Sequence, residues 1–435
     1  MPSLADAARR RVVIDNLLLP IAFFISPLAT SVAPRLTPLF VALLGIALIG
    51  SALRRGLHWR ELLPYQPALA ACLVFAAYVL LSATWSADPL DGLGKAGLLL
   101  GLILFTFAAV RAASALDKMT LCGAAVAFAA GALLGALFIV VELLTHGIVT
   151  RTVVTWLPFL ASRKHFDISG GVITKVHLSK FDQNVNLAMF HLWPGLLALI
   201  GLASTRRTIV MVVFFAVIAV VIAMSQHGSS QVALLVSSLV VILAWKWRTF
   251  VIRALAVFWC AAFVFVIPAN FAAYENGLHF ADWLSKSARA RVILWEYTAE
   301  QILDRPLLGA GVDSTPLLTD QQKAKFAREQ PEGFIYPRTM GHHAHSIFVQ
   351  TWSELGAVGA LLLALAGAAV VLLVSLLPIT AQPFAAGAFA ASAMVGAFAW
   401  GMWQSWFMCA VALLPIYLRA ASAAFTSQAE LKSIS

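Results

Sequence analysis

Apolar stretches long enough to cross a lipid bilayer follow one another along almost the whole chain. About twelve of them begin near Leu17, Leu36, Ala68, Gly92, Met119, Val185, Thr208, Ser230, Phe250, Ile347, Phe384 and Met402. A membrane-spanning helix needs roughly 20 apolar residues, whereas the strands of a membrane barrel are short and alternate in polarity. The chain is therefore predicted to be an all-α polytopic membrane protein with about twelve transmembrane helices.

The composition agrees with a chain whose solvent is mostly lipid. Of the 435 residues, 61% are hydrophobic and only 11% are charged. Soluble domains carry about 25% charged residues, so a soluble fold of this size would lack the charged surface that it needs. The four cysteines lie far apart within apolar runs and form no CxxC pair, so we expect neither disulfides nor a thiolate metal site.

Basic residues set the predicted orientation, because Lys and Arg gather in the cytoplasmic loops of membrane proteins. Topology therefore explains the formal charge of +10, and we expect no nucleic-acid partner. With the N-terminus inside, the inside segments hold the basic residues Arg9, Arg10, Arg11, Arg54, Arg55, Arg60, Arg111, Lys118, Arg206, Arg207, Lys246, Arg248, Arg253, Arg419 and Lys432. Ser31-Val32-Ala33 resembles a signal-peptidase site, but the many runs that follow favour a retained first helix. Both ends of the chain are thus predicted to be cytoplasmic.

Two long segments face outward in this arrangement, at about 145–183 and 270–346. Both are rich in basic residues, which topology does not explain, so we expect them to attract an anionic ligand or lipid head groups. The chain divides accordingly into three parts. Residues 1–269 hold transmembrane helices 1–9 and the first outer loop, residues 270–346 form the large outer loop that carries the chemistry, and residues 347–435 hold helices 10–12 and a cytoplasmic tail.

The large outer loop contains one amphipathic helix, predicted from Ser287 to Asp304 and closed by Pro306. Arg289 and Arg291 are expected in its first turn, where positive charge opposes the helix dipole. That position lowers stability but suits phosphate, which gains from the guanidinium groups and from free backbone N–H groups. We therefore predict that these two arginines bind phosphate, and the alternative is that they only extend to the membrane edge.

A histidine cluster, Gly341-His342-His343-Ala344-His345-Ser346, directly precedes the apolar run that begins at Ile347. Ser346 is a favourable N-cap, so His345 is expected at the outer mouth of a transmembrane helix. The positive helix end favours neutral imidazole, which makes His345 a candidate general base. Beside phosphate-binding arginines, such a base suggests transfer from an activated phosphate ester to a hydroxyl. Two alternatives stay open: His343 and His345 share a divalent ion, or the histidines form a plain interfacial cluster.

Three acidic or histidine side chains interrupt the apolar runs. Glu354 is expected about 12 Å below Ser346, because a helix rises 1.5 Å per residue, and an intramembrane carboxylate is usually paired. It orients the histidine end of the bundle, pairs with an arginine, or is protonated and hydrogen bonded. Glu142 and His191 flank the first outer loop, and we predict interfacial rather than catalytic positions for both.

Two blocks of residues resemble the signature of the O-antigen ligase/polymerase superfamily. The first block is Arg291-Val-Ile-Leu-Trp295 followed by Asp304-Arg-Pro-Leu-Leu-Gly-Ala-Gly311, which is similar to R-x-x-x-W … P-L-L-G-h-G. The second runs from His343-Ala-His345-Ser346 through Gln350 to Glu354-Leu-Gly-Ala-Val-Gly359, which is similar to H-x-H-[NS] … Q … E-x-G-x-x-G. The order of the blocks and the apolar runs around them extend the resemblance to most of the chain.

The resemblance implies a GT-C-like glycosyltransferase in the bacterial inner membrane, a multi-pass protein whose active site faces the periplasm. It implies undecaprenyl-pyrophosphate-linked O-antigen as donor, lipid A–core as acceptor and membrane lipids as further partners. Because such a donor already carries an activated leaving group that arginines can neutralise, we expect no cofactor and no metal ion. The overall plan is most similar to the O-antigen ligases, which move the polymer onto a sugar hydroxyl of lipid A–core in lipopolysaccharide biosynthesis. O-antigen polymerases and protein O-oligosaccharyltransferases share the signature and stay open as alternatives.

For the site, the resemblance and the chemistry together give His345 as the base, His343 as its partner and Arg291 as the phosphate clamp. A single displacement would invert the anomeric carbon. The substrate-binding residues are expected to be Arg289, Lys180, Arg163, Trp295 and Glu354. Lys180 and Arg163 replace arginines that relatives often carry where this chain has Gln183 and Gln231.

A transporter of an anionic lipid-linked substrate is the alternative from a different functional class. It predicts charges near the bilayer midplane and broken helices in paired positions. The sequence holds few midplane charges besides Glu354, and its basic residues gather in the outer loops instead.

Overall fold

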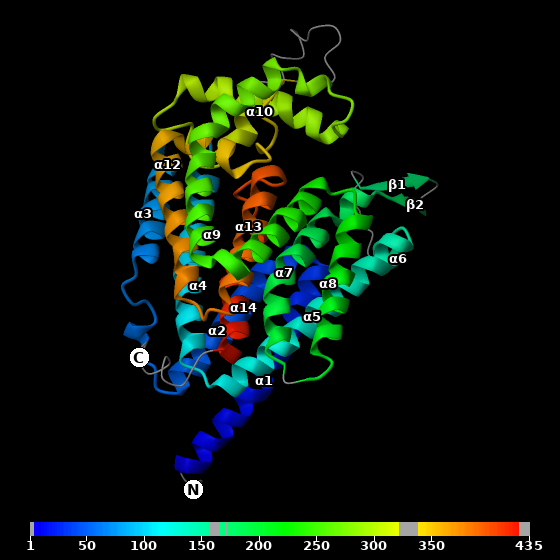
Figure 1. The fold of residues 1–435 in the computed structure, drawn as a ribbon. Coiled ribbons are helices and arrows are strands. Elements are labelled where there is room, and N and C mark those ends of the chain that lie inside the picture. The colour runs from blue at the N-terminus through cyan, green and yellow to red at the C-terminus, as the bar shows by residue number, and fades with distance from the viewer. Residues whose placement is uncertain (1–3, 157–164, 170–171, 203, 322–337, 426–435) are drawn as a thin grey trace.

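The computed structural model describes residues 4–156, 165–169, 172–202, 204–321 and 338–425, and it is a bundle of helices (Figure 1). The α-helices are α1 (Leu4–Val32), α2 (Thr37–Arg54), α3 (Pro67–Ser82), α4 (Pro89–Ser114), α5 (Lys118–Leu144), α6 (Ile148–Trp156), α7 (Asp182–Ile200), α8 (Arg207–Met224), α9 (Gly228–Glu275), α10 (Lys286–Asp304), α12 (Ile347–Leu372), α13 (Gln382–Phe398) and α14 (Ser405–Ser422). Short 3-10 helices include η1 (Pro34–Leu36), η3 (Ala83–Trp85), η5 (Leu178–Phe181) and η6 (Leu278–Phe280).

Each expected apolar run coincides with an α-helix, so the prediction of a multi-pass helical protein is confirmed. Among the described residues, 8 helical stretches are long and apolar enough to cross a membrane: Pro34–Arg54, Pro67–Trp85, Pro89–Ser114, Lys118–Leu144, Arg207–Met224, Gly228–Glu275, Ile347–Leu376 and Ser405–Phe425. Asn16–Val32 and Gln382–Phe398 are shorter apolar helices. The runs expected from Ser230 and Phe250 share α9, whose backbone leaves the helical region at Trp247 (φ −126°, ψ 44°). The count of twelve therefore stays a prediction.

Helix α7 is the most enclosed helix of the bundle. Nearly all of its side chains from Asn184 to Leu199 are buried, and it packs against α1, α5, α8, α13 and α14. A helix that is surrounded by protein can carry polar groups that lipid would not accept, because neighbouring backbone groups satisfy them. The Asn184 amide, for example, donates to Ser31 O at 2.6 Å.

Small residues let α5 approach α1 closely. At Gly131 an added Cβ would lie 2.0 Å from Phe24 O, and at Gly135 it would lie 2.6 Å from Ser31 Cβ. Without a hydrophobic driving force in lipid, such close backbone contact is a main source of helix association. Alanine at either glycine would push the two helices apart.

The two long outward-facing segments lie at one end of the bundle, which we call the outer end. Figure 1 shows α10 above this end, with β1 and β2 toward the same end, while the first turns of α1 project from the opposite end. This arrangement agrees with the predicted placement of both long loops on one side of the membrane and of the N-terminus on the other.

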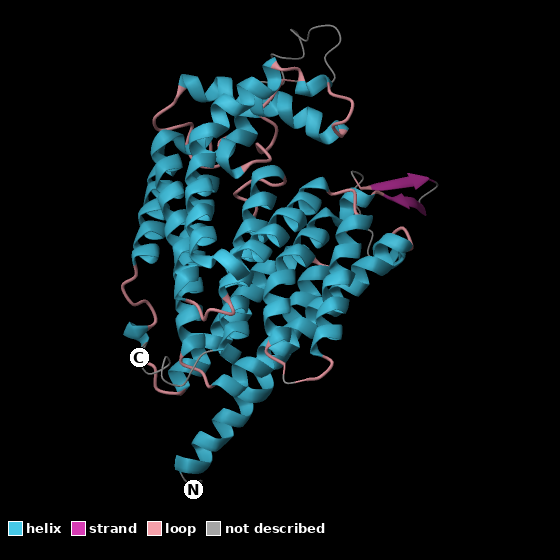
Figure 2. Ribbon diagram, viewed as in Figure 1, coloured by secondary structure: helices cyan, strands magenta, loops and turns pink. Residues whose placement is uncertain are grey.

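The first outer loop contains the only strands among the described residues, drawn in magenta in Figure 2. β1 (Phe166–Ser169) pairs antiparallel with β2 (Val172–Val176), with Phe166 opposite Val176. This hairpin was not predicted, because its alternating sequence pattern is only a few residues long. The all-α prediction is confirmed for the fold, to which this loop adds one short hairpin.

Candidate active site

His345 lies at the start of α12, as predicted. Its backbone is left-handed (φ 51°), a conformation that costs a non-glycine residue about 1 kcal/mol or more and that concentrates at functional sites. Ser346 occupies the N-cap with φ −154° and ψ 123°, but its side chain makes no capping hydrogen bond, which corrects the expected basis of the cap. Instead, Gln350 N donates to Ser346 O at 2.9 Å.

The imidazole of His345 is hydrogen bonded to the loop after α13. Its Nδ1 lies 2.7 Å from Ala399 O, in the loop after α13. A carbonyl oxygen only accepts, so Nδ1 carries the proton, and in the neutral ring the lone pair is on Nε2. The ring of His343 lies 4.1 Å from that of His345, centroid to centroid, so the two histidines come together as expected.

Helix α10 carries the arginines and is joined to the histidine segment. Ser285 caps it by accepting from Ala288 N at 3.2 Å, and its buried side chains Val292, Ala299 and Ile302 face the bundle, where α10 packs against α9 and α12. Trp295 Nε1 donates to Ala344 O at 2.6 Å. Trp295, expected to bind substrate, thus connects the two sequence blocks through the backbone of the histidine segment.

Arg291 is half-buried, and its electrostatic neighbours are Asp182 and His227. Burial lowers the pKa of Arg291, and Asp182 opposes this effect. Burial raises the pKa of Asp182 to about 7, against the influence of Arg291, and burial together with Arg291 lowers the pKa of His227 to about 4. The Nε–H of Arg291 is buried without a hydrogen-bond partner among the described residues, so it is available to an anionic ligand.

The structure does not bring Arg289 and Arg291 together. Because α10 begins at Lys286, Arg291 lies in the second turn rather than the first, and residues two apart on a helix do not face each other. Arg289 instead pairs with Asp282 at 3.3 Å. The expectation of one paired arginine clamp in the first turn is therefore wrong, and Arg291 alone faces Asp182 and His227.

The predicted basic residues of the first outer loop have different outcomes. Lys180, in η5, is half-buried, and burial and Arg35 lower its pKa while Glu142 raises it. The charged groups that shift the pKa of Lys180 are thus Arg35 and Glu142 and not Arg291. Asp182, two residues later, does interact electrostatically with Arg291. Arg163 lies outside the described residues, so its role stays a prediction.

Glu142 and His191 are both buried inside the protein, and their interfacial position stays a prediction. Glu142 is buried and accepts from Val149 N (2.8 Å) and Thr150 N (3.0 Å), so it caps α6 with a charge that the helix dipole favours. His191 is buried in the bundle, edge-on to Phe128 at 5.6 Å. The contacts of both residues are with helix ends and packed side chains of the bundle.

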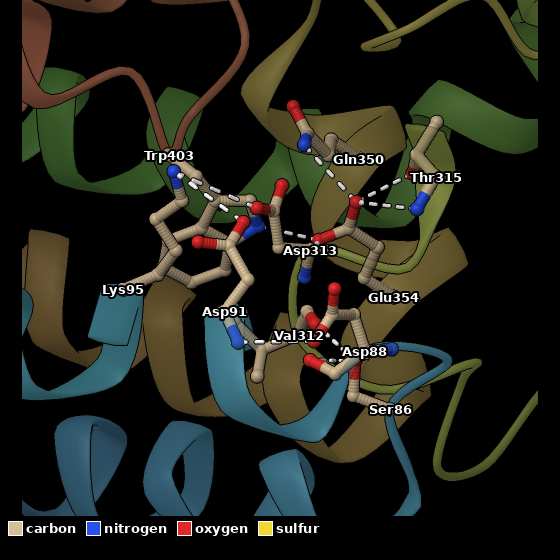
Figure 3. A network of polar contacts seen from close by, with 10 residues as sticks. All are labelled: Ser86, Asp88, Asp91, Lys95, Val312, Asp313, Thr315, Gln350, Glu354 and Trp403. Atoms are coloured by element: carbon tan, nitrogen blue, oxygen red, sulfur yellow. Dashed lines mark hydrogen bonds and ion pairs between the residues drawn. The ribbon is translucent and has the colours of Figure 1, made fainter. Parts of the chain in front are cut away.

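Glu354 is a fully buried acceptor at which three parts of the chain meet (Figure 3). Its carboxylate accepts from Asp313 N at 2.9 Å, from Thr315 Oγ1 at 2.5 Å, from Gln350 Nε2 at 3.1 Å and from Trp403 Nε1. Among the described residues its partners are amide, hydroxyl and indole groups, so the expected arginine pair is not found there. Of the predicted roles, the hydrogen-bonded carboxyl that orients its surroundings agrees with the structure.

The helix α12 breaks just after Glu354, at Gly356 (φ 63°, ψ −165°). The segment 306–311 runs along this break and pairs with it through four backbone hydrogen bonds. These are Ala310 N to Ser353 O (3.0 Å), Gly311 N to Glu354 O (2.7 Å), Ala357 N to Pro306 O (2.8 Å) and Val358 N to Leu307 O (3.2 Å). Tyr78 of α3 donates to the freed carbonyl of Leu355 at 2.8 Å. The two sequence blocks are thus joined backbone to backbone, which satisfies groups that lipid could not.

Residues 312–315 extend this junction to the start of α4 (Figure 3). Ser86 Oγ donates to Val312 O at 2.6 Å, and Lys95 Nζ lies 3.7 Å from a carboxylate oxygen of both Asp91 and Asp313. Burial, the charge of Glu354 and a hydrogen bond with Asp91 raise the pKa of Asp313 to about 7, and Lys95 opposes them. The large outer loop is therefore anchored to α4 as well as to α12.

His227 is a site residue that the sequence analysis missed. It precedes α9 and lies near Arg291, and its Nδ1 is 2.9 Å from Ser230 Oγ, which donates to Asn186 Oδ1 at 3.1 Å. Its ring stacks against Trp400 at 6.1 Å. A lone histidine after an apolar run gives no signal in sequence, because only the fold brings the α8–α9 corner to α10.

Gln231 and the possible metal ligands remain to be placed. Gln231 donates to Ser225 O at 3.0 Å, so it closes the α8–α9 corner rather than facing Arg291. Within the described parts of the chain, no three His, Cys, Asp or Glu side chains are grouped so that they could hold a metal ion. Metal-independent chemistry stays a prediction.

Comparison with known proteins bears on this site directly. Residues 211–364 match the family model described as O-antigen ligase. The match covers α8, α9 and α10, the histidine segment and the break in α12, which together hold both sequence blocks. A search of curated proteins found no match. The resemblance drawn from the two blocks is confirmed over this stretch: residues 211–364 are similar to the O-antigen ligase family.

Proposed function

We propose that the protein is an O-antigen ligase. It transfers O-antigen polysaccharide from undecaprenyl pyrophosphate to a sugar hydroxyl of lipid A–core, at the periplasmic face of the bacterial inner membrane, as an inverting enzyme of GT-C-like architecture. The observation that carries the proposal is the imidazole of His345, held as the Nδ1–H tautomer by Ala399 O at the outer end of the bundle. The family match at residues 211–364 supports the same class of chemistry.

The proposed reaction is a single displacement. The acceptor hydroxyl oxygen attacks the anomeric carbon, and His345 Nε2 removes the hydroxyl proton as the bond forms. The bond between the anomeric carbon and the pyrophosphate oxygen breaks, and its electron pair leaves with undecaprenyl pyrophosphate. His343 binds the acceptor or orients His345, and the anomeric configuration inverts.

Arg291 is proposed to stabilise the leaving pyrophosphate. Its guanidinium has a buried Nε–H without a described partner, and an arginine forks onto phosphate oxygens in a way that lysine cannot. Since the donor already carries the activated leaving group, the reaction needs no nucleotide, and arginine charge takes the place of a metal ion. Lys180, Arg289 and Arg163 are proposed to attract the anionic donor more generally, through the field of the outer loops.

The two related activities, O-antigen polymerase and protein O-oligosaccharyltransferase, would use the same donor site and differ in acceptor. A transporter is a weaker alternative, although α12 is broken as transporter helices often are. In this chain residues 306–311 fill the break at Gly356. Their backbone groups form hydrogen bonds with the N–H and C=O groups of α12 that the break leaves without helical partners. Such a filled break favours a rigid junction over a substrate pathway.

Reconstitution of the purified protein tests the proposal. The protein is placed in liposomes with a lipid-pyrophosphate-linked glycan and lipid A–core, without nucleotide or added metal, and products are followed by gel shift. We expect glycan on lipid A–core. Donor glycans joined to one another would show a polymerase, and a folded protein that consumes no donor with either acceptor would contradict glycan transfer and favour a transporter.

A further inference from the structure

The loop between α13 and α14, residues 399–404, contacts both histidines of the site. Ala399 O accepts the hydrogen bond from His345 Nδ1 at 2.7 Å. At Gly401, an added Cβ would lie 2.7 Å from the Cβ of His343, so the backbone of the loop lies directly against that residue. The loop therefore holds the imidazole of His345 through a hydrogen bond and packs against the Cβ of His343.

Two buried side chains of α12 hold the loop in turn. Gln350 Oε1 accepts from Met402 N at 3.0 Å, and Glu354 accepts from Trp403 Nε1. The two side chains are also bonded to each other, because Gln350 Nε2 donates to Glu354 Oε1 at 3.1 Å. Hydrogen bonds therefore hold the loop to Gln350 and Glu354 at residues 402–403 and to His345 at Ala399, and the backbone of residues 399–403 connects these two points.

The carboxylate fixes which way the Gln350 amide points. A carboxylate only accepts, so it takes the NH2 group of Gln350 and leaves the amide oxygen facing Met402 N–H. Glutamate and glutamine have the same shape, so exchanging them changes the donors and acceptors without changing the volume. This makes the pair a point at which hydrogen-bond direction can be tested apart from packing.

We propose that Glu354 and Gln350 are positioning residues for His345. They hold the α13–α14 loop so that Ala399 O keeps the imidazole as the Nδ1–H tautomer, with the lone pair on Nε2. The proposal rests on the proposed role of His345 as base, and neither residue touches the reacting atoms. Both are buried below the histidines rather than open to a substrate.

The single variant Glu354→Gln should break the hydrogen bonds that hold the loop. If the new amide offers its NH2 group to Gln350, the Gln350 amide turns and its own NH2 group opposes the N–H of Met402. If the new amide keeps its oxygen toward Gln350, its NH2 group opposes the donors Asp313 N and Trp403 Nε1. In either orientation two donors oppose each other, and the loop moves away from α12. The exchanged pair Glu354→Gln/Gln350→Glu restores these bonds, because a carboxylate at position 350 accepts from both the new amide and Met402 N.

Transfer kinetics and histidine NMR on the full-length protein in liposomes test the proposal. In Glu354→Gln, kcat falls about 100-fold or more, in the range that a general base contributes, while the donor KM stays within about threefold of wild type, as expected for a residue without ground-state contact. The exchanged pair recovers most of the lost kcat. Glu61→Gln, an exposed carboxylate at the other end of the bundle, is the matched control and keeps full activity.

The tautomer itself is measured with ¹⁵N-labelled histidine, using His345→Gln to assign the signal. We expect the Nδ1–H form in wild type, its loss in Glu354→Gln and its return in the exchanged pair. An unchanged kcat and tautomer in Glu354→Gln would overturn the proposal, as would equal losses in the single variant and the exchanged pair. If the tautomer follows the pair while wild type transfers no glycan, positioning stands and the proposed function fails.

Discussion

The junction between segment 306–311 and the broken helix α12 makes the glycine at its centre a sharp test of the structure. Gly356 has φ 63° and ψ −165°, a backbone conformation that residues other than glycine very rarely adopt. An added Cβ would lie 2.3 Å from Leu307 O and 2.4 Å from Leu307 C. These are backbone atoms, so the clash in Gly356→Ala cannot be relieved by turning a side chain.

The expected loss of stability follows from these contacts. The backbone conformation alone costs a non-glycine residue about 1–3 kcal/mol. The clash with Leu307 also displaces the bonds Ala357 N to Pro306 O and Val358 N to Leu307 O, each worth about 1 kcal/mol. We expect Gly356→Ala to lower the free energy of unfolding by about 3–5 kcal/mol.

Thermal unfolding in detergent, followed by near-ultraviolet circular dichroism, measures this effect. Gly97→Ala is the matched control, because nothing lies within 4 Å of a Cβ added at Gly97, on an exposed face of α4. In a helix interior that change stabilises by up to about 1 kcal/mol. Equal melting temperatures for Gly356→Ala and Gly97→Ala would refute the junction described here.

Three further predictions concern the chemistry. Arg291→Lys retains the charge but loses the fork, so the transfer rate should fall about 100-fold, measured as kcat/KM for the donor; activity near wild type would contradict the clamp. Burial raises the pKa of Asp182 to about 7, so its carboxyl is neutral below that pH and ionised above it, where it offsets Arg291 and repels phosphate. The donor KM should therefore rise above about pH 7 in wild type and stay level in Asp182→Asn, and identical pH profiles would oppose this account. Transfer should continue in excess chelator, and a loss that a divalent ion restores would favour the metal alternative.

The helices were predictable because lipid leaves few alternatives for a long apolar run. The continuity of α9 was not, since Lys246-Trp247-Arg248 has the charge of a cytoplasmic turn while the backbone only kinks at Trp247. The central position of α7 also could not be predicted. Neighbouring helices satisfy its buried polar residues, and no pattern along the chain shows which helices those are. Packing among helices decides both features.

The same division applies to the site. The position of His345 just before α12 was predictable from local sequence, whereas Arg291 lies one turn further into α10 than expected. The partners of Glu354 were not predictable, because Thr315 and Trp403 come to it from 39 and 49 residues away. The opposite faces of Arg289 and Arg291 could have been predicted from their spacing of two residues, which a helix does not place side by side.

The central claim is that His345 performs a proton transfer and does not serve to bind the donor. The most direct measurement is single-turnover transfer by wild type and His345→Ala in liposomes, with donor binding measured in parallel on the same preparations. We expect the rate of transfer in His345→Ala to fall by about 10²–10⁴-fold while donor affinity stays the same. Transfer at the wild-type rate, or a loss of rate matched by an equal loss of donor affinity, would contradict the account.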